Sequence, residues 1–224
     1  VNSPLVLEDG RYRMDLDDME QKIREHDVKV FILCSPHNPV GRVWTKDELA
    51  AAGRLCEKYD VIVVSDESHS DFTYAGLTHT VFPSISPQLA ERTILCTAPS
   101  KTFNLAGLQV SNIFVPDQKL RRAMRRAIVQ TGYGNLNMMG LAACQAAYEK
   151  GEEWLQDLKR YLTDNLMYLR QRIKEDLPGI RLIEPEGTYL VWLDLRELDL
   201  SEEEQRKLIV DDAGLWLDTG TMFG

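Results

Sequence analysis

Three loops carry side chains that could take part in chemistry, and each loop follows a short apolar run. Asn38 lies in the first loop, Asp66 and His69 lie in the second, and Ser100 and Lys101 lie in the third. A lysine in partly apolar surroundings has a lowered pKa, which favours a Schiff base with a carbonyl compound. An aspartate can keep the nitrogen of a pyridine ring protonated, so that the ring withdraws electrons. Together these residues predict a site for amine and carbonyl chemistry.

The surroundings of Lys101 favour the reactive interpretation. Apolar residues flank it on both sides, namely Ala98, Pro99, Phe103, Leu105 and Ala106. We therefore expect the Lys101 amine to be partly buried. The ordinary alternatives are a surface lysine and, for Asp66, the N-terminal cap of a helix.

The elements that must position these loops alternate between strand and helix. Apolar, mostly β-branched runs predict buried strands at Val28–Cys34, Val61–Val64, Thr93–Thr97 and Gln109–Val115. Thr45 and Glu48 have the spacing of a capping box, which predicts a helix that ends near Tyr59. This alternation predicts an α/β fold with a mostly parallel sheet covered by helices. Ligands of such sheets bind beyond the carboxyl ends of the strands, where the three loops lie.

The second part of the chain is predominantly helical. Residues 117–131 and 136–177 predict two long helices, the second broken near Gly151. The rest predicts an antiparallel strand pair, a capped helix and a last strand, at Ile180–Ile183 with Thr188–Leu195, Ser201–Asp212 and Gly214–Leu217. We place a domain boundary near residue 150, between a large domain at 1–150 and the start of a smaller α+β domain at 151–224.

Charge and composition exclude several classes of function. The chain has 224 residues with 26 Lys and Arg against 35 Asp and Glu, a net charge of −9. This charge disfavours nucleic-acid binding, so we interpret an arginine cluster as a solvated helix face or a subunit contact. The cluster consists of Arg121, Arg122, Arg125 and Arg126. No apolar run approaches the roughly 20 residues of a membrane span, so no membrane partner is expected.

The four cysteines have unrelated spacings that predict neither a zinc site nor a disulfide framework. They are Cys34, Cys56, Cys96 and Cys144. Buried thiols of this kind are typical of a reducing compartment, and no signal peptide is visible at residues 1–4. We therefore expect a cytoplasmic protein.

Three motifs carry a resemblance to a known family. They are Asn38-Pro-Val-Gly41, Ser65-Asp-Glu-Ser-His69 and Ser100-Lys-Thr-Phe-Asn-Leu-Ala-Gly107. Their order resembles the fold-type I pyridoxal-phosphate (PLP) enzymes of the class I and II aminotransferase family. His69 and the Lys101 motif resemble one branch, the cystathionine β-lyases and the maltose-regulon-modulator-like C–S lyases. The likeness extends to Pro185–Asp194, which is similar to the strand pair of the family's small domain.

The resemblance implies a role for each matching position. Lys101 would carry PLP as a Schiff base and then remove the substrate Cα proton. Asp66 would pair with the pyridine nitrogen, and Asn38 would hydrogen-bond the phenolic oxygen. His69 stands where aminotransferases have a tyrosine, so it would bond the same oxygen or pack beside it.

Other positions have weaker implied roles. Ser100 would contact the phosphate, and Thr97 would assist it or serve as an ordinary strand residue. Tyr189 would approach the substrate entrance or pack in the core. Gln109 stands where aminotransferases usually have a phosphate-binding arginine, which favours the lyase branch.

The resemblance also implies a larger protein than this chain. The family's two-domain size suggests about 390 residues, so we interpret the chain as a central fragment with little activity alone. The missing parts would hold the phosphate loop, the ring that stacks on the pyridine and the arginine that binds the substrate carboxylate. Because the family builds each site from two subunits, we expect a homodimer. Gly132–Asn137 is a candidate subunit contact, or an ordinary turn between helices.

The function that the resemblance implies is a PLP-dependent C–S β-lyase. It would convert cystathionine or a cysteine S-conjugate to pyruvate, ammonia and a thiol. The alternatives are an aminotransferase on the same fold and a non-catalytic regulatory or binding protein that kept the fold. A metal site at Asp66, His69 and Asp71 is a further alternative, although no second cluster of ligands supports it.

Overall fold

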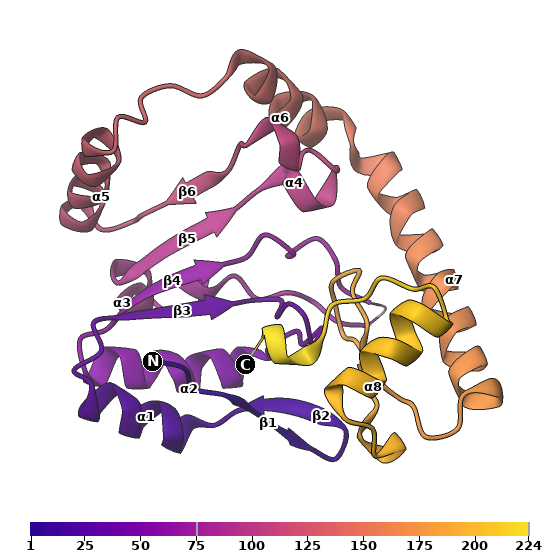
Figure 1. Cartoon of the computed structure of the whole chain (residues 1–224). Coiled ribbons are helices and arrows are strands. Elements are labelled where there is room, and N and C mark those ends of the chain that lie inside the picture. The colour runs from indigo at the N-terminus through magenta and orange to yellow at the C-terminus, as the bar shows by residue number, and fades with distance from the viewer. Residues whose placement is uncertain (75, 224) are drawn as a thin grey trace.

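Four strands form one sheet, and three of them run parallel. The computed structural model describes residues 1–74 and 76–223. The strands β3 (Val30–Cys34), β4 (Ile62–Asp66), β5 (Thr93–Thr97) and β6 (Asn112–Phe114) are hydrogen-bonded in that order. β3, β4 and β5 are parallel, and β6 is antiparallel to β5 (Figure 1). The predicted α/β fold with a mostly parallel sheet is confirmed.

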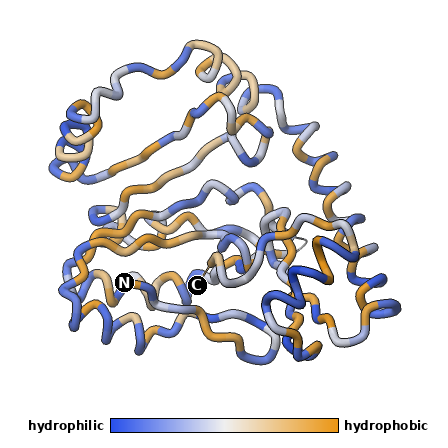
Figure 2. Tube along the Cα trace, in the orientation of Figure 1, coloured by the Kyte–Doolittle hydropathy of each residue, from blue (hydrophilic) through white to orange (hydrophobic). Residues whose placement is uncertain are grey.

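Helices α1 (Leu16–Glu25), α2 (Lys46–Lys58) and α3 (Pro87–Glu91) pack against one face of the sheet. Four side chains are fully buried at this contact: Leu49 and Cys56 of α2, Val63 of β4, and Val61 just before β4. Figure 2 shows hydrophobic residues along the strands, whereas α1 and α2 alternate between hydrophobic and hydrophilic positions. Burial of these apolar side chains is the main force that holds α2 against the sheet.

The predicted capping box of α2 is present. The Thr45 hydroxyl accepts a hydrogen bond from the Glu48 amide at 3.2 Å, and the Glu48 carboxylate accepts one from the Thr45 amide at 2.8 Å. Both amides would otherwise lack a helical partner at the first turn. The helix therefore starts at a defined residue after the loop that carries Asn38.

An N-terminal hairpin is an element that the sequence analysis did not anticipate. β1 (Leu5–Glu8) pairs with β2 (Arg11–Met14) in antiparallel register, and Asp15 caps the following helix α1. Each strand has only four residues, so the period of two is too short to distinguish from a polar loop.

The long helices follow the prediction closely. α5 (Gln118–Gln130), α6 (Met138–Lys150) and α7 (Glu152–Asp176) follow the short helix α4 (Pro99–Thr102). The break between α6 and α7 falls at Gly151, where an added Cβ would clash with the ring of Phe103. In Figure 1, α7 runs along the side toward which the arrowheads of β3, β4 and β5 point. The proposed domain boundary near residue 150 coincides with this break and stays a prediction.

The remaining elements are short. The predicted antiparallel pair is confirmed as β7 (Arg181–Ile183) with β8 (Trp192–Asp194). Turns of 3-10 helix lie at Phe82–Ser84, Ala106–Leu108, Arg196–Leu198 and Gly220–Met222. None of the described helices is long and apolar enough to cross a membrane.

Near the end of the chain, one prediction is confirmed and one is wrong. The predicted helix begins after its capping residue Ser201 and reaches Asp212, as α-helix in α8 (Glu202–Arg206) and as π-helix over Lys207–Asp212. The strand predicted at Gly214–Leu217 does not form, and Trp216 is 88% exposed there. An apolar run becomes a strand only when another strand pairs with it, and no described strand does so here.

Candidate active site

The predicted site residues lie around one edge of the sheet. In the register of the strands, Asp66 of β4 stands between Cys34 of β3 and Cys96 of β5. Just beyond this row, the Ser35 amide donates to the Asp66 carbonyl oxygen at 2.9 Å, and the Glu67 amide donates to the Cys96 carbonyl oxygen at 2.8 Å. The loops after β3, β4 and β5 therefore leave the sheet side by side, as the sequence predicts.

Asp66 has an exposed carboxylate at the end of the central strand. One of its oxygens, Oδ1, accepts hydrogen bonds from the Ser68 amide at 3.1 Å and the Ser68 hydroxyl at 2.6 Å. The other oxygen has no hydrogen bond to any residue in the described ranges. One oxygen is thus held in place, and the other is free to bind a ligand.

His69 is 5% exposed, and its Nδ1 is buried without a hydrogen-bond partner among the described residues. Its ring lies 5.3 Å from the ring of Tyr189 and 6.5 Å from that of Phe72, measured between centroids. Burial lowers the pKa of His69, the positive charge of Lys101 lowers it further, and the charge of Asp66 opposes both. The ring is therefore held neutral near the two charges at the strand ends.

Lys101 lies in α4 and is exposed, so the predicted partial burial is wrong for the chain as described. Phe103, one of the apolar neighbours expected to cover Lys101, instead packs against the rings of Tyr148 and Trp154. The Thr102 hydroxyl donates to the Asp71 carboxylate at 2.6 Å and ties α4 to the loop after β4. The Lys101 amine makes no ion pair with any described carboxylate.

Asn38 is exposed in the loop after β3, and its backbone amide donates to the Cys34 sulfur at 3.3 Å. Ser100 is half-buried beside Lys101. Thr97 is half-buried at the end of β5, near Tyr148 of α6. The roles implied for Asn38, Ser100 and Thr97 stay predictions.

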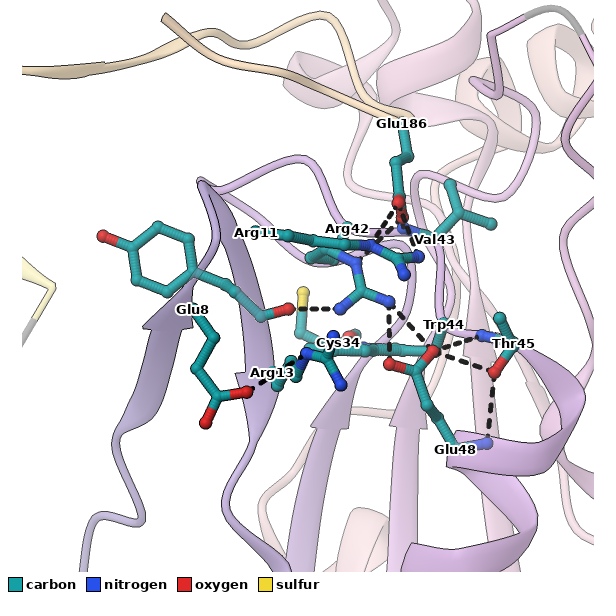
Figure 3. A network of polar contacts seen from close by, with 11 residues as sticks. Glu8, Arg11, Arg13, Cys34, Arg42, Val43, Trp44, Thr45, Glu48 and Glu186 are labelled. Atoms are coloured by element: carbon teal, nitrogen blue, oxygen red, sulfur yellow. Dashed lines mark hydrogen bonds and ion pairs between the residues drawn. The ribbon is translucent and has the colours of Figure 1, made fainter. Parts of the chain in front are cut away.

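A network of charged residues beside the site was not predicted from the sequence. Arg42 is 2% exposed and joins Glu48 and Glu186, which come from distant parts of the sequence (Figure 3). Arg11 of the hairpin, with a 43% exposed side chain, also pairs with Glu186 (Figure 3). A signal was available, because Arg42 is a charged residue between the apolar neighbours Val40 and Val43-Trp44.

The free groups at this edge fit PLP. Lys101 offers an amine for a Schiff base and Asp66 offers a carboxylate oxygen for a protonated ring nitrogen, while His69 has a buried nitrogen with no hydrogen-bond partner in the described part of the chain. Asn38 offers an amide at the same edge. In contrast, the described His, Cys, Asp and Glu side chains form no group of three that could hold a metal ion, so Asp66, His69 and Asp71 do not make the metal site considered above.

Comparisons with known proteins agree with this fit. The chain is 39% identical over its whole length to cystathionine beta-lyase PatB of Bacillus subtilis (strain 168) and covers 58% of that protein. It is 32% identical over 99% of its length to protein MalY of Escherichia coli (strain K12), of which it covers 57%. Its structure superimposes on cystalysin of Treponema denticola, which contains a pyridoxal 5'-phosphate cofactor, with a TM-score of 0.96 and 35% identity over the whole chain and 57% of cystalysin.

The chain therefore spans somewhat more than half of the length of these relatives. The sequence pattern described as aminotransferase class I and II matches residues 6–224, which include all three motifs of the site. The order of the motifs, the sheet that gathers them and this match agree, and the chain belongs to the class I and II aminotransferase family.

Proposed function

We propose that this chain forms part of a PLP-dependent C–S β-lyase. The observation that carries the proposal is the grouping of free groups at the carboxyl edge of the sheet: a lysine amine, an aspartate oxygen and a buried histidine nitrogen. Similarity to a cystathionine beta-lyase across the whole chain supports the reaction class.

When bound, PLP would withdraw electrons from the Cα atom of an amino-acid substrate. Lys101 would hold the group covalently through Nζ and, once released, would accept the Cα proton on that atom. Asp66 would keep the ring nitrogen protonated with its free oxygen. Asn38 and His69 would bind the phenolic oxygen, and Ser100 and Thr97 are the candidates for the phosphate.

The neutral ring of His69 suits the proposed contact. A neutral imidazole has one nitrogen that donates and one that accepts, so it can bond the phenolic oxygen without adding a charge. Burial and the charge of Lys101 lower the pKa of His69, which keeps this form dominant at neutral pH.

In the proposed reaction, the Cα proton moves to Lys101 and the Cβ–S bond breaks. The sulfur leaves with the bonding electrons and takes up a proton to give the thiol. The remaining three-carbon fragment adds water and ends as pyruvate and ammonia. The proposed substrates are cystathionine and related cysteine S-conjugates.

We also propose a homodimer, with α6 and the segment before it in the contact. Val129, Tyr133, Met138 and Met139 are between 53% and 84% exposed in this region. Exposed apolar side chains gathered on one region are typical of protein interfaces. The four cysteines are free thiols, which supports a reducing, cytoplasmic location.

The experiment that tests the reaction uses the full-length protein loaded with PLP. With cystathionine and no keto acid, a lyase releases pyruvate, ammonia and a thiol in equal amounts. An aminotransferase gives no pyruvate under these conditions, but forms glutamate when an amino donor and 2-oxoglutarate are present. Glutamate formation without pyruvate would contradict the proposed lyase and favour the aminotransferase alternative.

A further inference from the structure

Arg42 connects three separate parts of the chain through one buried guanidinium group. Its Nε donates to a Glu186 oxygen at 2.9 Å, and a terminal nitrogen donates to Glu48 at 2.8 Å. The other terminal nitrogen donates to the backbone carbonyl of Tyr12 in β2 (Figure 3). The planar guanidinium spreads its N–H donors over three nitrogen atoms in a rigid fork, whereas a lysine has all its donors on one nitrogen and cannot bridge partners that lie as far apart.

The backbone around Arg42 makes a second set of contacts with the same partner segment. The Gly41 carbonyl oxygen accepts hydrogen bonds from the Glu186 amide at 2.8 Å and the Gly187 amide at 2.9 Å. On the other side, the Thr188 amide donates to the Phe72 carbonyl oxygen at 2.9 Å. The turn at Pro185–Thr188 is therefore held between the loop after β3 and the loop after β4.

This turn leads directly to the aromatic contact at His69. Tyr189 follows Thr188, and its ring lies 5.3 Å from the His69 ring and 5.2 Å from the Phe72 ring. The loop after β3 carries Asn38 only four residues before Arg42. Arg42 thus belongs to the loop that carries Asn38 and binds Glu186 of the turn that leads to Tyr189.

The charges in the network make this connection sensitive to single substitutions. Glu186 is 16% exposed and its carboxylate accepts from Arg42, from Arg11 and from the Val43 amide. Burial alone would raise the pKa of Glu48, but hydrogen bonds from Arg42 and Thr45 outweigh it and leave that pKa below its ordinary value. Removal of the Arg42 charge would leave the partly buried Glu48 without its cationic partner and Glu186 with Arg11 alone, which is unfavourable.

We propose that Arg42 and Glu186 are positioning residues that hold the Tyr189–His69 pair against the Asn38 loop and so shape the binding site for the phenolic side of PLP. This inference rests on the proposed function for the identity of the ligand. We call the contacts of Arg42 and Gly41 with Glu186 and Gly187 the clamp. These contacts lie within this chain, so they can be measured with no cofactor present.

The test compares Arg42→Met and Arg42→Lys with Arg11→Met in the full-length protein. Arg11 is the matched control, because it binds the same Glu186 carboxylate at 2.6 Å but is 43% exposed and has no ion pair with the described residues of either loop of the site. Amide hydrogen exchange without PLP reports on the clamp. The pH at which the visible absorption of lysine-bound PLP changes reports on the phenolic side of the site.

Both Arg42 variants should speed exchange of the Glu186 and Gly187 amides about tenfold or more, and Arg11→Met should leave it within about twofold. The same Arg42 variants should shift the absorption midpoint by about half a pH unit or more, while Arg11→Met leaves it unchanged. Faster exchange with an unchanged midpoint would overturn the inference, because Arg42 would then be only a structural brace. Unchanged exchange would overturn it as well.

Two further results keep the test decisive. If Arg42→Met does not fold, two milder variants replace it. Arg42→Lys keeps a positive charge at position 42, and Glu186→Gln keeps the side-chain shape at position 186. Amide exchange and the absorption midpoint are measured on both. If the unsubstituted protein binds no PLP, the proposed function fails, whereas the exchange measurement still decides whether the clamp exists.

Discussion

At the scale of single residues, the neighbours Asp66 and Glu67 show how the fold separates a binding carboxylate from a structural one. Glu67 is 1% exposed and accepts hydrogen bonds from the Ser65 hydroxyl at 2.9 Å and the Phe82 amide at 2.9 Å, with His79 at 2.6 Å from its other oxygen. Asp66 is exposed and keeps one oxygen free. The Ser65-Asp-Glu-Ser-His69 motif indicated Asp66 as the site carboxylate, and the groups that surround each side chain in the structure give the physical difference between the two.

Asp66→Asn should weaken PLP binding about 10- to 100-fold, since a charge-assisted hydrogen bond to the ring nitrogen is lost. A titration of the apoprotein followed by absorption measures the change. Asp60→Asn is the matched control: Asp60 precedes the same strand at its opposite end and has a fully exposed side chain. Equal affinity of the Asp66 variant and the unsubstituted protein would contradict the assigned role.

His37 should make the stability of the protein depend on pH. Burial, followed by the charge of Arg42, lowers the pKa of His37 to about 4. As the pH falls below about 6.5, the unfolded chain takes up this proton and the folded chain does not, so stability is lost between roughly pH 6.5 and pH 4. His37 alone should cost about 2 kcal/mol between pH 7 and pH 5.

Urea unfolding at both pH values measures this cost. His37→Phe keeps a ring beside Trp44, whose centroid lies 5.8 Å away, and should remove that part of the pH dependence. His26→Gln, at an exposed histidine at the end of α1, is the control and should retain it. Identical pH slopes for the His37 variant and the unsubstituted protein would show that His37 does not lose its proton affinity on folding.

Much of the site could be predicted residue by residue, and its limits have a physical cause. Asn38, Asp66 and Lys101 follow strand ends, so order along the chain already places them at one edge of a parallel sheet. Arg42 and Glu186 are 144 positions apart in the chain, and local spacing does not indicate that they meet. The exposure of Lys101 likewise depends on what packs around α4, which local sequence does not decide.

At the scale of elements, the capping box of α2 supports the Asn38 loop as well as the helix. Thr45→Ala should lower the free energy of unfolding by about 1 kcal/mol, because the Glu48 amide loses its partner. Ser201→Ala removes an equivalent box from α8, which has no buried residue. It should fray that helix locally and leave the urea midpoint unchanged. An equal loss of unfolding free energy from both substitutions would contradict the expectation that only the capping box of α2 supports the whole fold.

The turn at Gly187 has no room for a side chain. A Cβ at Gly187 would lie 2.5 Å from the Phe72 carbonyl oxygen and 2.7 Å from a Val43 methyl carbon. Gly187→Ala should therefore lower stability by about 1–3 kcal/mol through overpacking, measured by urea unfolding. Gly107→Ala is the control, because nothing lies within 4 Å of its added Cβ. A Gly187 variant as stable as the control would argue against the tight contact.

Elements that carry several signals were predicted well, and those that depend on a partner were not. α2 combines a capping box with a buried apolar face, and α7 begins after a glycine that fits closely against Phe103. The run Gly214–Leu217 has β-type apolar residues but no neighbouring strand within the described ranges, so it stays irregular. The hairpin β1–β2 is the opposite case. Its two strands pair in the structure, although their sequence pattern did not predict them.

At the scale of the whole molecule, the described chain leaves large apolar surfaces open. Ile32 of β3 is 72% exposed and Phe114 of β6 is 54% exposed, at the two outer edges of the sheet. A cavity of about 590 Å³ lies along the β3 edge, between the hairpin, α1 and Trp192. Uncovered apolar edges of this kind favour association with other segments or subunits, so activity is best measured on the full-length protein.

The most direct test of the central claim is to find which residue PLP modifies. The full-length protein is incubated with PLP, reduced with borohydride, digested and mapped by mass spectrometry. We predict one phosphopyridoxyl adduct on Lys101, absent in Lys101→Ala and retained in a control variant at the exposed Lys174. Scattered labelling of many lysines, or none at Lys101, would contradict the account of this edge of the sheet as a PLP site.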